Sequence, residues 1–174
     1  MQEQPLEPPN KLTLAILGEG GIGKTTFVNT FKEGTFSPSS MTMAVAVEYH
    51  VKRTEIDSQP VQLQIWDLGG QGQFTTMNLF PQYLEGTQAA AACFDVTDLE
   101  TLDVLPDWIN LLPANIPLIL VGLKTDLLET PFDEEEIQPL LGTYPIIKFY
   151  LVSAKDLGSV QQVFRALSSF ALEK

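Results

Sequence analysis

Apolar and polar positions along this chain follow a pattern that predicts strands separated by helices. Residues 11–17 (KLTLAIL) favour a strand, a glycine-rich stretch follows, and residues 27–34 then carry apolar side chains at helical spacing up to Gly34. Residues 41–51 and 61–66 alternate apolar and polar side chains on either side of a turn-rich link at 53–60. This second pattern predicts an antiparallel hairpin.

The rest of the chain repeats a simple rhythm of strand and helix. Strands are predicted at residues 88–96, 117–122 and 146–152, and helices at 99–112, 133–141 and 159–172, with a partly helical segment at 77–86. Strands that are apolar throughout and alternate with helices predict a largely parallel sheet covered on both faces. We therefore expect one α/β domain over residues 11–174, preceded by a flexible leader at residues 1–10, where three prolines leave little apolar surface.

Charge narrows the range of partners. The chain carries 10 lysines and arginines against 22 acids, a formal net charge of −12. A nucleic-acid polymer or an anionic membrane is bound through a basic footprint, so we expect a protein partner or a small ligand instead. The single cysteine, Cys93, excludes an intramolecular disulfide and a site built from several cysteines. Without a long apolar run or an apolar signal segment, the expected location is cytoplasmic.

Residues 18–25 (GEGGIGKT) match the pattern of a phosphate-binding loop, and they lie between a predicted strand and a predicted helix. Glycines let several backbone N–H groups converge on phosphate oxygens, while Lys24 supplies charge and Thr25 offers a hydroxyl to Mg²⁺. A glycine-rich turn without a ligand is the alternative, and the strand before and helix after argue against it. The loop predicts nucleotide binding.

A second string, residues 67–71 (DLGGQ), follows the strand at 61–66. Asp67 at a strand end beside a phosphate loop can hold Mg²⁺ through water, and a glycine after it can place a bare N–H at a γ-phosphate. Gln71 is then positioned to orient an attacking water. The same string could also be an ordinary turn after a strand.

Five segments, in this order and spacing, resemble the Ras superfamily of small GTPases: GEGGIGKT, WDLGGQ, FDVTD at 94–98, LVGLKTD at 120–126 and LVSAK at 151–155. The resemblance runs from Lys11 to the end of the chain, with Rab- or Ras-like and Arf-like features mixed, so no subfamily is assigned. It implies a P-loop NTPase fold of three α/β/α layers, with a mostly parallel six-stranded sheet and one antiparallel edge strand. It also implies Mg²⁺ as cofactor and GTP and GDP as substrate and product.

The resemblance implies a role for each motif position. Lys24 would contact the β- and γ-phosphates, and Gln71 would position the attacking water. Thr42 would bind Mg²⁺ and the γ-phosphate, although Thr35, Ser39 and Ser40 are nearby alternatives. The implied catalytic residues are Gln71, Lys24 and Thr42, and the implied metal-site residues are Thr25, Thr42 and Asp67. The implied nucleotide-binding residues are Gly20, Gly21, Ile22, Gly23, Lys24, Thr25, Thr26, Phe36, Thr42, Gly70, Lys124, Asp126, Ser153, Ala154 and Lys155.

Base choice depends on the later motifs. A carboxylate at Asp126 can accept from the guanine N1 and exocyclic amino groups, which adenine does not match. Lys124 and Phe36 would cover the ring, and residues 153–155 would form the second base loop. Leu123 departs from the family, which usually has asparagine there to tie the base loop to the phosphate loop. We therefore expect GTP over ATP, with weaker retention or faster exchange than a typical member.

The chain has two arginines, Arg53 and Arg165, and neither lies in the 33–42 segment, where a built-in arginine finger would have to be. We expect slow intrinsic hydrolysis, assisted by a finger from an activating protein. The expected protein partners are activating factors, exchange factors and effectors. A GTP-binding scaffold with little turnover and a P-loop ATPase or kinase are the alternatives. A surface for effectors would include Met41, Met43, Phe74, Met77, Phe80 and Tyr83, although half of these could equally pack inward.

Three further expectations concern single features. The only histidine, His50, lies in a predicted edge strand and is expected to face solvent, while Trp66 and Trp108 are expected to be packing residues. Position 2 is glutamine where myristoylation requires glycine, and the last four residues hold no cysteine to prenylate. We therefore expect no direct membrane anchor in this chain, so that membranes are reached through a partner or through a tail that this sequence lacks.

Overall fold

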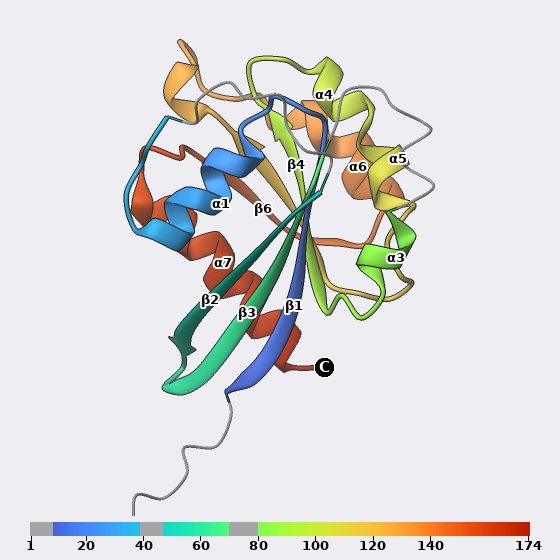
Figure 1. Cartoon of the computed structure of the whole chain (residues 1–174). Coiled ribbons are helices and arrows are strands. Elements are labelled where there is room, and N and C mark those ends of the chain that lie inside the picture. The colour runs from blue at the N-terminus through green and yellow to red at the C-terminus, as the bar shows by residue number, and fades with distance from the viewer. Residues whose placement is uncertain (1–8, 39–46, 70–79) are drawn as a thin grey trace, which may run out of the picture.

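The computed structural model describes residues 9–38, 47–69 and 80–174 and places six strands in one sheet (Figure 1). The strands are β1 (Asn10–Leu17), β2 (Val47–Ile56), β3 (Gln59–Leu68), β4 (Ala89–Asp95), β5 (Leu118–Leu123) and β6 (Ile146–Val152). Their order is β2-β3-β1-β4-β5-β6, and every pair is parallel except β2 with β3. The predicted mostly parallel sheet with one antiparallel edge strand is confirmed.

Helices cover both faces of this sheet (Figure 1). On one face lie α1 (Lys24–Glu33) and α7 (Leu157–Leu172); on the other lie α3 (Pro81–Leu84), α4 (Glu100–Asp103), α5 (Leu105–Ile109) and α6 (Gln138–Thr143). Two short 3₁₀ helices, η1 (Thr125–Leu127) and η2 (Glu134–Ile137), precede α6. The helix predicted over 99–112 is wrong as a single element, since it is split into α4 and α5. Pro106 has no N–H to continue the ladder of the first helix, which explains the break.

The link of the hairpin is shorter than its sequence pattern predicts. The link expected at 53–60 is nearly all strand, and the turn is formed by Asp57 and Ser58 alone. Both residues have positive φ, 49° and 66°. Two successive left-handed residues give the tight turn whose twist matches antiparallel strands, and aspartate tolerates this conformation better than most residues. The predicted beginning of the hairpin, residues 41–46, lies outside the described residues.

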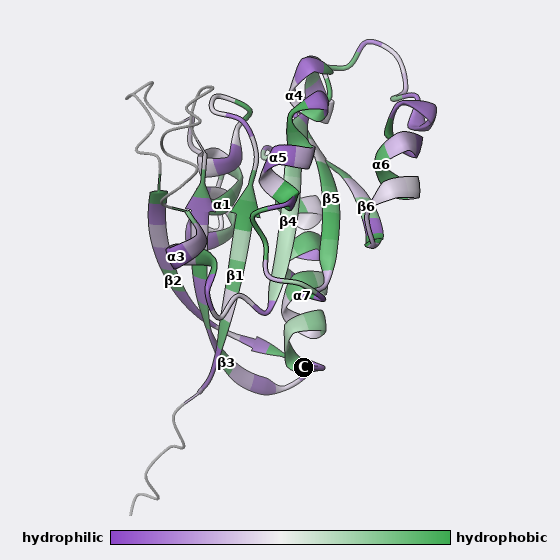
Figure 2. Cartoon of the chain, turned by 90° about the vertical axis from the view of Figure 1, so that its right-hand side faces the viewer, coloured by the Kyte–Doolittle hydropathy of each residue, from purple (hydrophilic) through white to green (hydrophobic). Residues whose placement is uncertain are grey.

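The core has one cluster of buried side chains on each face of the sheet. On the side of α1 and α7, Phe164 is fully buried and stacks on Phe27 and Phe31, with ring centroids 4.9 and 4.0 Å apart. Figure 2 shows that β1, β4 and β5 are the most hydrophobic strands, as central strands covered on both faces should be. The edge strand β6 is not covered on both faces, because its apolar residues Ile147 and Leu151 are exposed.

Both tryptophans are packing residues, as predicted. Trp108 is buried, and Trp66 is partly buried and packs on Tyr49 and Tyr83. His50 does lie on edge strand β2, yet the expectation that it faces solvent is wrong, because only 8% of it is exposed. Its register partner is the buried Ile65, which belongs to the core on the side of α1 and α7. His50 therefore points toward that core side of the sheet.

Candidate nucleotide-binding site

The phosphate loop follows β1 directly and is held against the sheet by a glycine. A Cβ atom on Gly18, whose φ is 147°, would lie 2.3 Å from the backbone oxygen of Cys93 in β4. Only glycine can approach a neighbouring strand so closely. Further along the loop, Gly21 and Gly23 also have positive φ, 80° and 99°. The chain then enters α1 at Lys24, so the predicted strand, loop and helix are all present.

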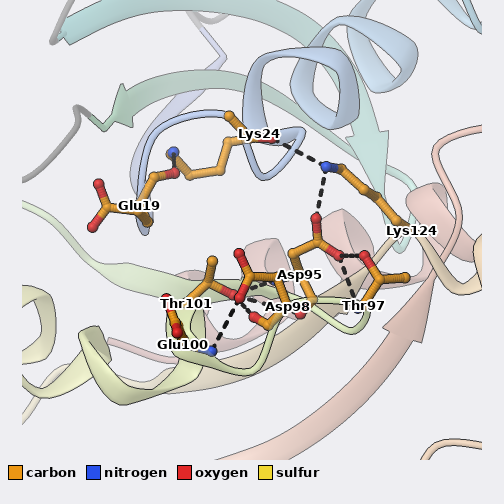
Figure 3. Close-up of polar contacts among 9 residues, drawn as sticks. Glu19, Lys24, Asp95, Thr97, Asp98, Glu100, Thr101 and Lys124 are labelled. Atoms are coloured by element: carbon orange, nitrogen blue, oxygen red, sulfur yellow. Dashed lines mark hydrogen bonds and ion pairs between the residues drawn. The ribbon is translucent and has the colours of Figure 1, made fainter.

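Lys24 lies beneath this loop, with 5% of its surface exposed. Its Nζ donates a hydrogen bond to the backbone oxygen of Glu19 at 2.7 Å, a contact drawn in Figure 3. A Cβ on Gly69 would lie 2.3 Å from the same Nζ, so the lysine also closely approaches the segment that follows β3. Burial lowers the pKa of Lys24 despite the nearby Asp67 carboxylate. The ammonium is thus placed between the two predicted phosphate-contacting segments.

Thr25 and Asp67 meet beside this lysine. The Thr25 hydroxyl donates to Asp67 Oδ2 at 2.7 Å, and Asp67, at the end of β3, is almost fully buried. A hydroxyl and a carboxylate supply hard oxygen donors, the kind that Mg²⁺ prefers. The two residues predicted for the metal site from separate motifs are therefore brought together, and their chemistry fits that ion.

The residues predicted to recognise the base converge from two loops. Asp126 in η1 accepts a hydrogen bond from the Ser153 hydroxyl at 2.9 Å and pairs with Lys155 Nζ at 3.2 Å, one partner on each carboxylate oxygen. Burial acts to raise the pKa of Asp126, but the Ser153 and Lys155 hydrogen bonds outweigh it and hold the pKa below its usual value. The carboxylate is therefore kept ionised and fixed in orientation, ready to accept from a ligand.

A cavity of about 260 Å³ lies against these residues. Phe36 forms part of its wall, and Lys155 Nζ lies 5.8 Å from the centroid of that ring. The cavity joins predicted residues from the phosphate loop, the segment after α1 and both base loops. Its lining consists of Ile22, Gly23, Thr26, Phe36, Pro38, Leu123, Lys124, Asp126, Leu127, Ala154 and Lys155. Pro38 and Leu127 had no sequence signal, because an apolar residue in a loop predicts nothing specific.

Lys124 connects the predicted base loop to the phosphate loop. Its carboxylate partner is Asp95, a residue to which the motifs assigned no role. The Lys124 Nζ donates to the backbone oxygen of Gly21 at 3.1 Å and lies 2.7 Å from Asp95 Oδ2 (Figure 3). Asp95 Oδ1 in turn accepts from the backbone N–H and the hydroxyl of Thr97. Burial acts to raise the pKa of Asp95, but its bonds to Lys124 and Thr97 hold it below the usual value. The available signal was the position of Asp95 at the carboxyl end of a parallel strand, where ligands of such sheets bind.

Several predicted residues lie outside the described residues: Thr42, Gly70 and Gln71, the alternatives Ser39 and Ser40, and Met41, Met43, Phe74 and Met77 of the expected effector surface. Thr35, the remaining hydroxyl alternative, is exposed, and Gly20 donates its N–H to the Glu19 side chain at 3.3 Å. Phe80 is buried, so it does not belong to an effector surface. Tyr83 is partly buried and packs on Trp66.

Comparison with known proteins decides which family this site represents. The sequence profile of the Ras family matches residues 13–172, nearly the whole chain. The chain belongs to the Ras family. It is a small GTPase, and members of this family are generally GTP-binding hydrolases that act as switches.

The curated Ras-family relatives include several Rab proteins. The Ras-related protein Rab-19 of Rattus norvegicus is 31% identical, with 86% of this chain and 70% of the relative covered. RABD2a of Arabidopsis thaliana is 29% identical over 92% of this chain and 80% of its own length. Rab-12 of Mus musculus is 30% identical over 99% of this chain and 72% of its own length.

Arg53 lies in β2, where its Nε donates to Gln62 at 3.4 Å, and Arg165 lies in α7, so neither contributes to the cavity lined by Phe36 and Asp126. Among the described residues, no helix has the length and apolar character needed to cross a bilayer.

Proposed function

We propose that this chain is a GTP-hydrolysing switch that selects guanine through Asp126. The observation that carries the proposal is the carboxylate fixed by Ser153 and Lys155 at the wall of a cavity that also reaches the phosphate loop. An ionised carboxylate can accept from the adjacent N1–H and amino group of guanine. Adenine offers no such pair of donors, so ATP would not form these two hydrogen bonds with the carboxylate and would bind poorly.

A competition experiment tests the choice of base. We expect unlabelled GTP to displace a fluorescent GDP analogue at far lower concentrations than ATP does. Asp126→Ala should remove most of this preference, whereas Asp133→Ala is a matched control because Asp133 caps η2 and does not line the cavity. Equal displacement by ATP and GTP in the wild-type chain would favour the alternative of a P-loop ATPase or kinase.

For phosphate chemistry, Lys24 and the loop N–H groups would bind and orient the phosphates. Thr25, Asp67 and Thr42 would hold Mg²⁺, which when bound neutralises charge on the phosphate oxygens. Gln71 would orient the attacking water. Release of the γ-phosphate would end the contacts of Thr42 and Gly70, and this change in two loops would distinguish the GTP state from the GDP state for effectors.

We further propose slow intrinsic hydrolysis, with an activating protein supplying an arginine in trans. The positions of Arg53 and Arg165 support this proposal, since neither lines the described cavity. Single-turnover hydrolysis should be slow in the isolated chain and slower still in Gln71→Leu. Hydrolysis at several per second without a partner would contradict the need for an external arginine. A wild-type rate equal to that of Gln71→Leu would instead favour the GTP-binding scaffold.

We propose weaker nucleotide retention because of Leu123, although a contact of the neighbouring lysine acts in the opposite direction. Leu123 is buried at the end of β5 and offers no polar group, but Lys124 beside it bonds to the phosphate loop through Gly21 and is held by Asp95. We propose that this lysine carries the connection that asparagine usually makes. The dissociation rate of GDP, measured without an exchange factor, reports how fully it does so.

A protein-binding surface is supported by an aromatic row on the sheet face opposite α1 and α7. Tyr49 is 46% exposed and packs on Trp66, whose ring is followed by that of Tyr83, with centroid distances of 4.6 and 5.3 Å. Exposed aromatic side chains are enriched in protein interfaces. We propose that effectors contact this row. Tyr49→Ala should weaken effector capture by the GTP-loaded protein without changing nucleotide affinity.

A cytoplasmic location with partner-dependent recruitment to membranes remains a prediction.

A further inference from the structure

The strand that carries His50 also carries a carboxylate, and the neighbouring strand supplies another. Glu48, His50 and Asp67 each place one possible ligand atom within 4.8 Å of the other two. The register explains the grouping, because Glu48 pairs with Asp67 and the side chain of residue 50 points to the same face two positions along the strand. Three potential metal ligands thus come from two adjacent strands of a rigid sheet.

His50 has an unsatisfied polar atom within this group. Its Nε2 is buried and has no hydrogen-bond partner, although Glu48 Oε2 lies 3.4 Å away. A buried polar atom without a partner costs about 1–3 kcal/mol, so native proteins rarely keep one without a use. An imidazole nitrogen aimed at carboxylate oxygens has two uses: it can be protonated and form an ion pair, or it can bind a cation.

We propose that Glu48, His50 and Asp67 form a binding site for a divalent transition-metal ion of the Zn²⁺ class. Zn²⁺ bonds of about 2.1 Å at tetrahedral angles separate neighbouring ligand atoms by roughly 3.4 Å, which is the distance from His50 Nε2 to Glu48 Oε2. The other separations in the group are at most 4.8 Å and so exceed this tetrahedral separation by about 1.4 Å at most, which small side-chain movements would close, leaving one position for water or another ligand. Imidazole with two carboxylates suits zinc or a similar ion, whereas Mg²⁺ prefers oxygen alone.

The charges of the group support a cation. Glu48 and Asp67 contribute two carboxylates, and two lysines act electrostatically on the group: Lys24 on Asp67, and Lys32 on His50. Burial is the largest influence on His50 and lowers its pKa, which keeps the imidazole neutral as a ligand must be. Asp67 would be common to this site and to the proposed Mg²⁺ site, so the two sites would be neighbours. Glu48 and His50 would belong to the new site alone.

The test uses the full chain without a polyhistidine tag, loaded with Mg²⁺ and GDP, and titrated with ZnCl₂. Because the chain has one histidine, its imidazole gives one set of ¹H–¹⁵N correlations, and no second histidine can confuse the assignment. The one cysteine, Cys93, is fully buried and does not compete for zinc. We expect the Nε2 resonance to shift and saturate at one equivalent of Zn²⁺, with millimolar Mg²⁺ unable to reverse the shift.

Variants separate a metal site from nonspecific binding. Glu48→Gln keeps the side-chain shape and should weaken Zn²⁺ binding tenfold or more, since even outer-shell partners of a metal contribute roughly 10–100-fold. His50→Ala should abolish the one-equivalent binding seen by calorimetry. The control is Glu55→Gln, which changes an exposed acid of the same strand outside the group. Far-UV circular dichroism and GDP binding establish that each variant is folded. An unshifted imidazole at one equivalent, or equal Zn²⁺ affinity in wild type and folded Glu48→Gln, would overturn the proposal.

Discussion

The pair formed by Asp95 and Lys124 allows a quantitative test of how this GTPase holds its nucleotide. Asp95→Asn keeps an oxygen to accept the two bonds from Thr97, but it replaces the oxygen that faces Lys124 with an amide NH₂ group. The lysine then loses its charged partner 2.7 Å away and faces a donor instead. The change is therefore directed at the orientation of Lys124, while the turn after β4 is left in place.

The magnitude follows from the burial of the two groups. A hydrogen bond to a charged group contributes about 1.5–3 kcal/mol, and solvent screening reduces this where a partner is exposed. The side chain of Asp95 is 9% exposed and that of Lys124 is 33% exposed, so the lower part of the range applies. A loss of about 1–2 kcal/mol corresponds to roughly 5–30-fold faster release of GDP.

The assay is displacement of a fluorescent GDP analogue by excess GDP under Mg²⁺. Asp98→Asn is the matched control, because Asp98 lies three residues further along, in the exposed turn after β4, and its side chain accepts from the Glu100 N–H instead of Lys124. Lys124→Met provides the second arm of a double-mutant cycle. If Asp95 acts through Lys124, the double variant should release GDP no faster than Lys124→Met alone. Additive effects, or an Asp95→Asn rate equal to that of the wild type, would refute the reasoning.

Three further predictions address the scaffold. Gly18→Ala should lower the melting temperature by several degrees and weaken GDP binding, because the added Cβ meets the Cys93 backbone oxygen at 2.3 Å and overpacking costs about 1–3 kcal/mol; unchanged melting would show that the loop can move away. Phe164→Ala should cost about 3–5 kcal/mol in urea unfolding, because a fully buried ring that stacks on two others is lost; a cost below about 1 kcal/mol would contradict this packing. Acidification should destabilise the fold as Asp95 and Asp126 become protonated, because both have folded pKa values below the ordinary 3.8. The contribution of these carboxylates to the free energy of unfolding is therefore complete above that pH and is lost as the pH falls through the folded pKa values. Asp95→Asn should flatten the dependence of unfolding free energy on pH below about 4, and an unchanged slope would count against the assignment.

The sequence predicted most of the fold because hydrophobic periodicity and glycine positions are local signals. The strands at β1, β5 and β6 and the end of α1 at Gly34 follow directly from them. The errors arose where one residue decides the local structure. Pro106 splits a helix that the apolar pattern predicts to be continuous. Asp57 and Ser58 form the hairpin turn, but the polar residues around them do not indicate which two residues form it.

The candidate site was predictable where a motif fixes chemistry and unpredictable where pairing across the sheet fixes it. The phosphate loop and Asp67 were named from their sequence patterns and Asp126 from the family resemblance, and the structure brings them to one edge of the sheet. The contact of Asp95 with Lys124 depends on the order of β4 and β5, which no local pattern gives. The burial of His50 likewise depends on which face of the edge strand the hairpin register selects.

The thiol of Cys93, which lies in β4 beneath the phosphate loop, makes the protein suited to site-specific labelling. It is fully buried, and burial raises its pKa to about 12. At neutral pH only about one thiol in 10⁵ would be ionised, and alkylating reagents react with the thiolate. A cysteine introduced at Leu127, which is 57% exposed and lines the base cavity, would therefore be the one group that a maleimide dye modifies. Such a dye would report nucleotide exchange without removal of the native cysteine.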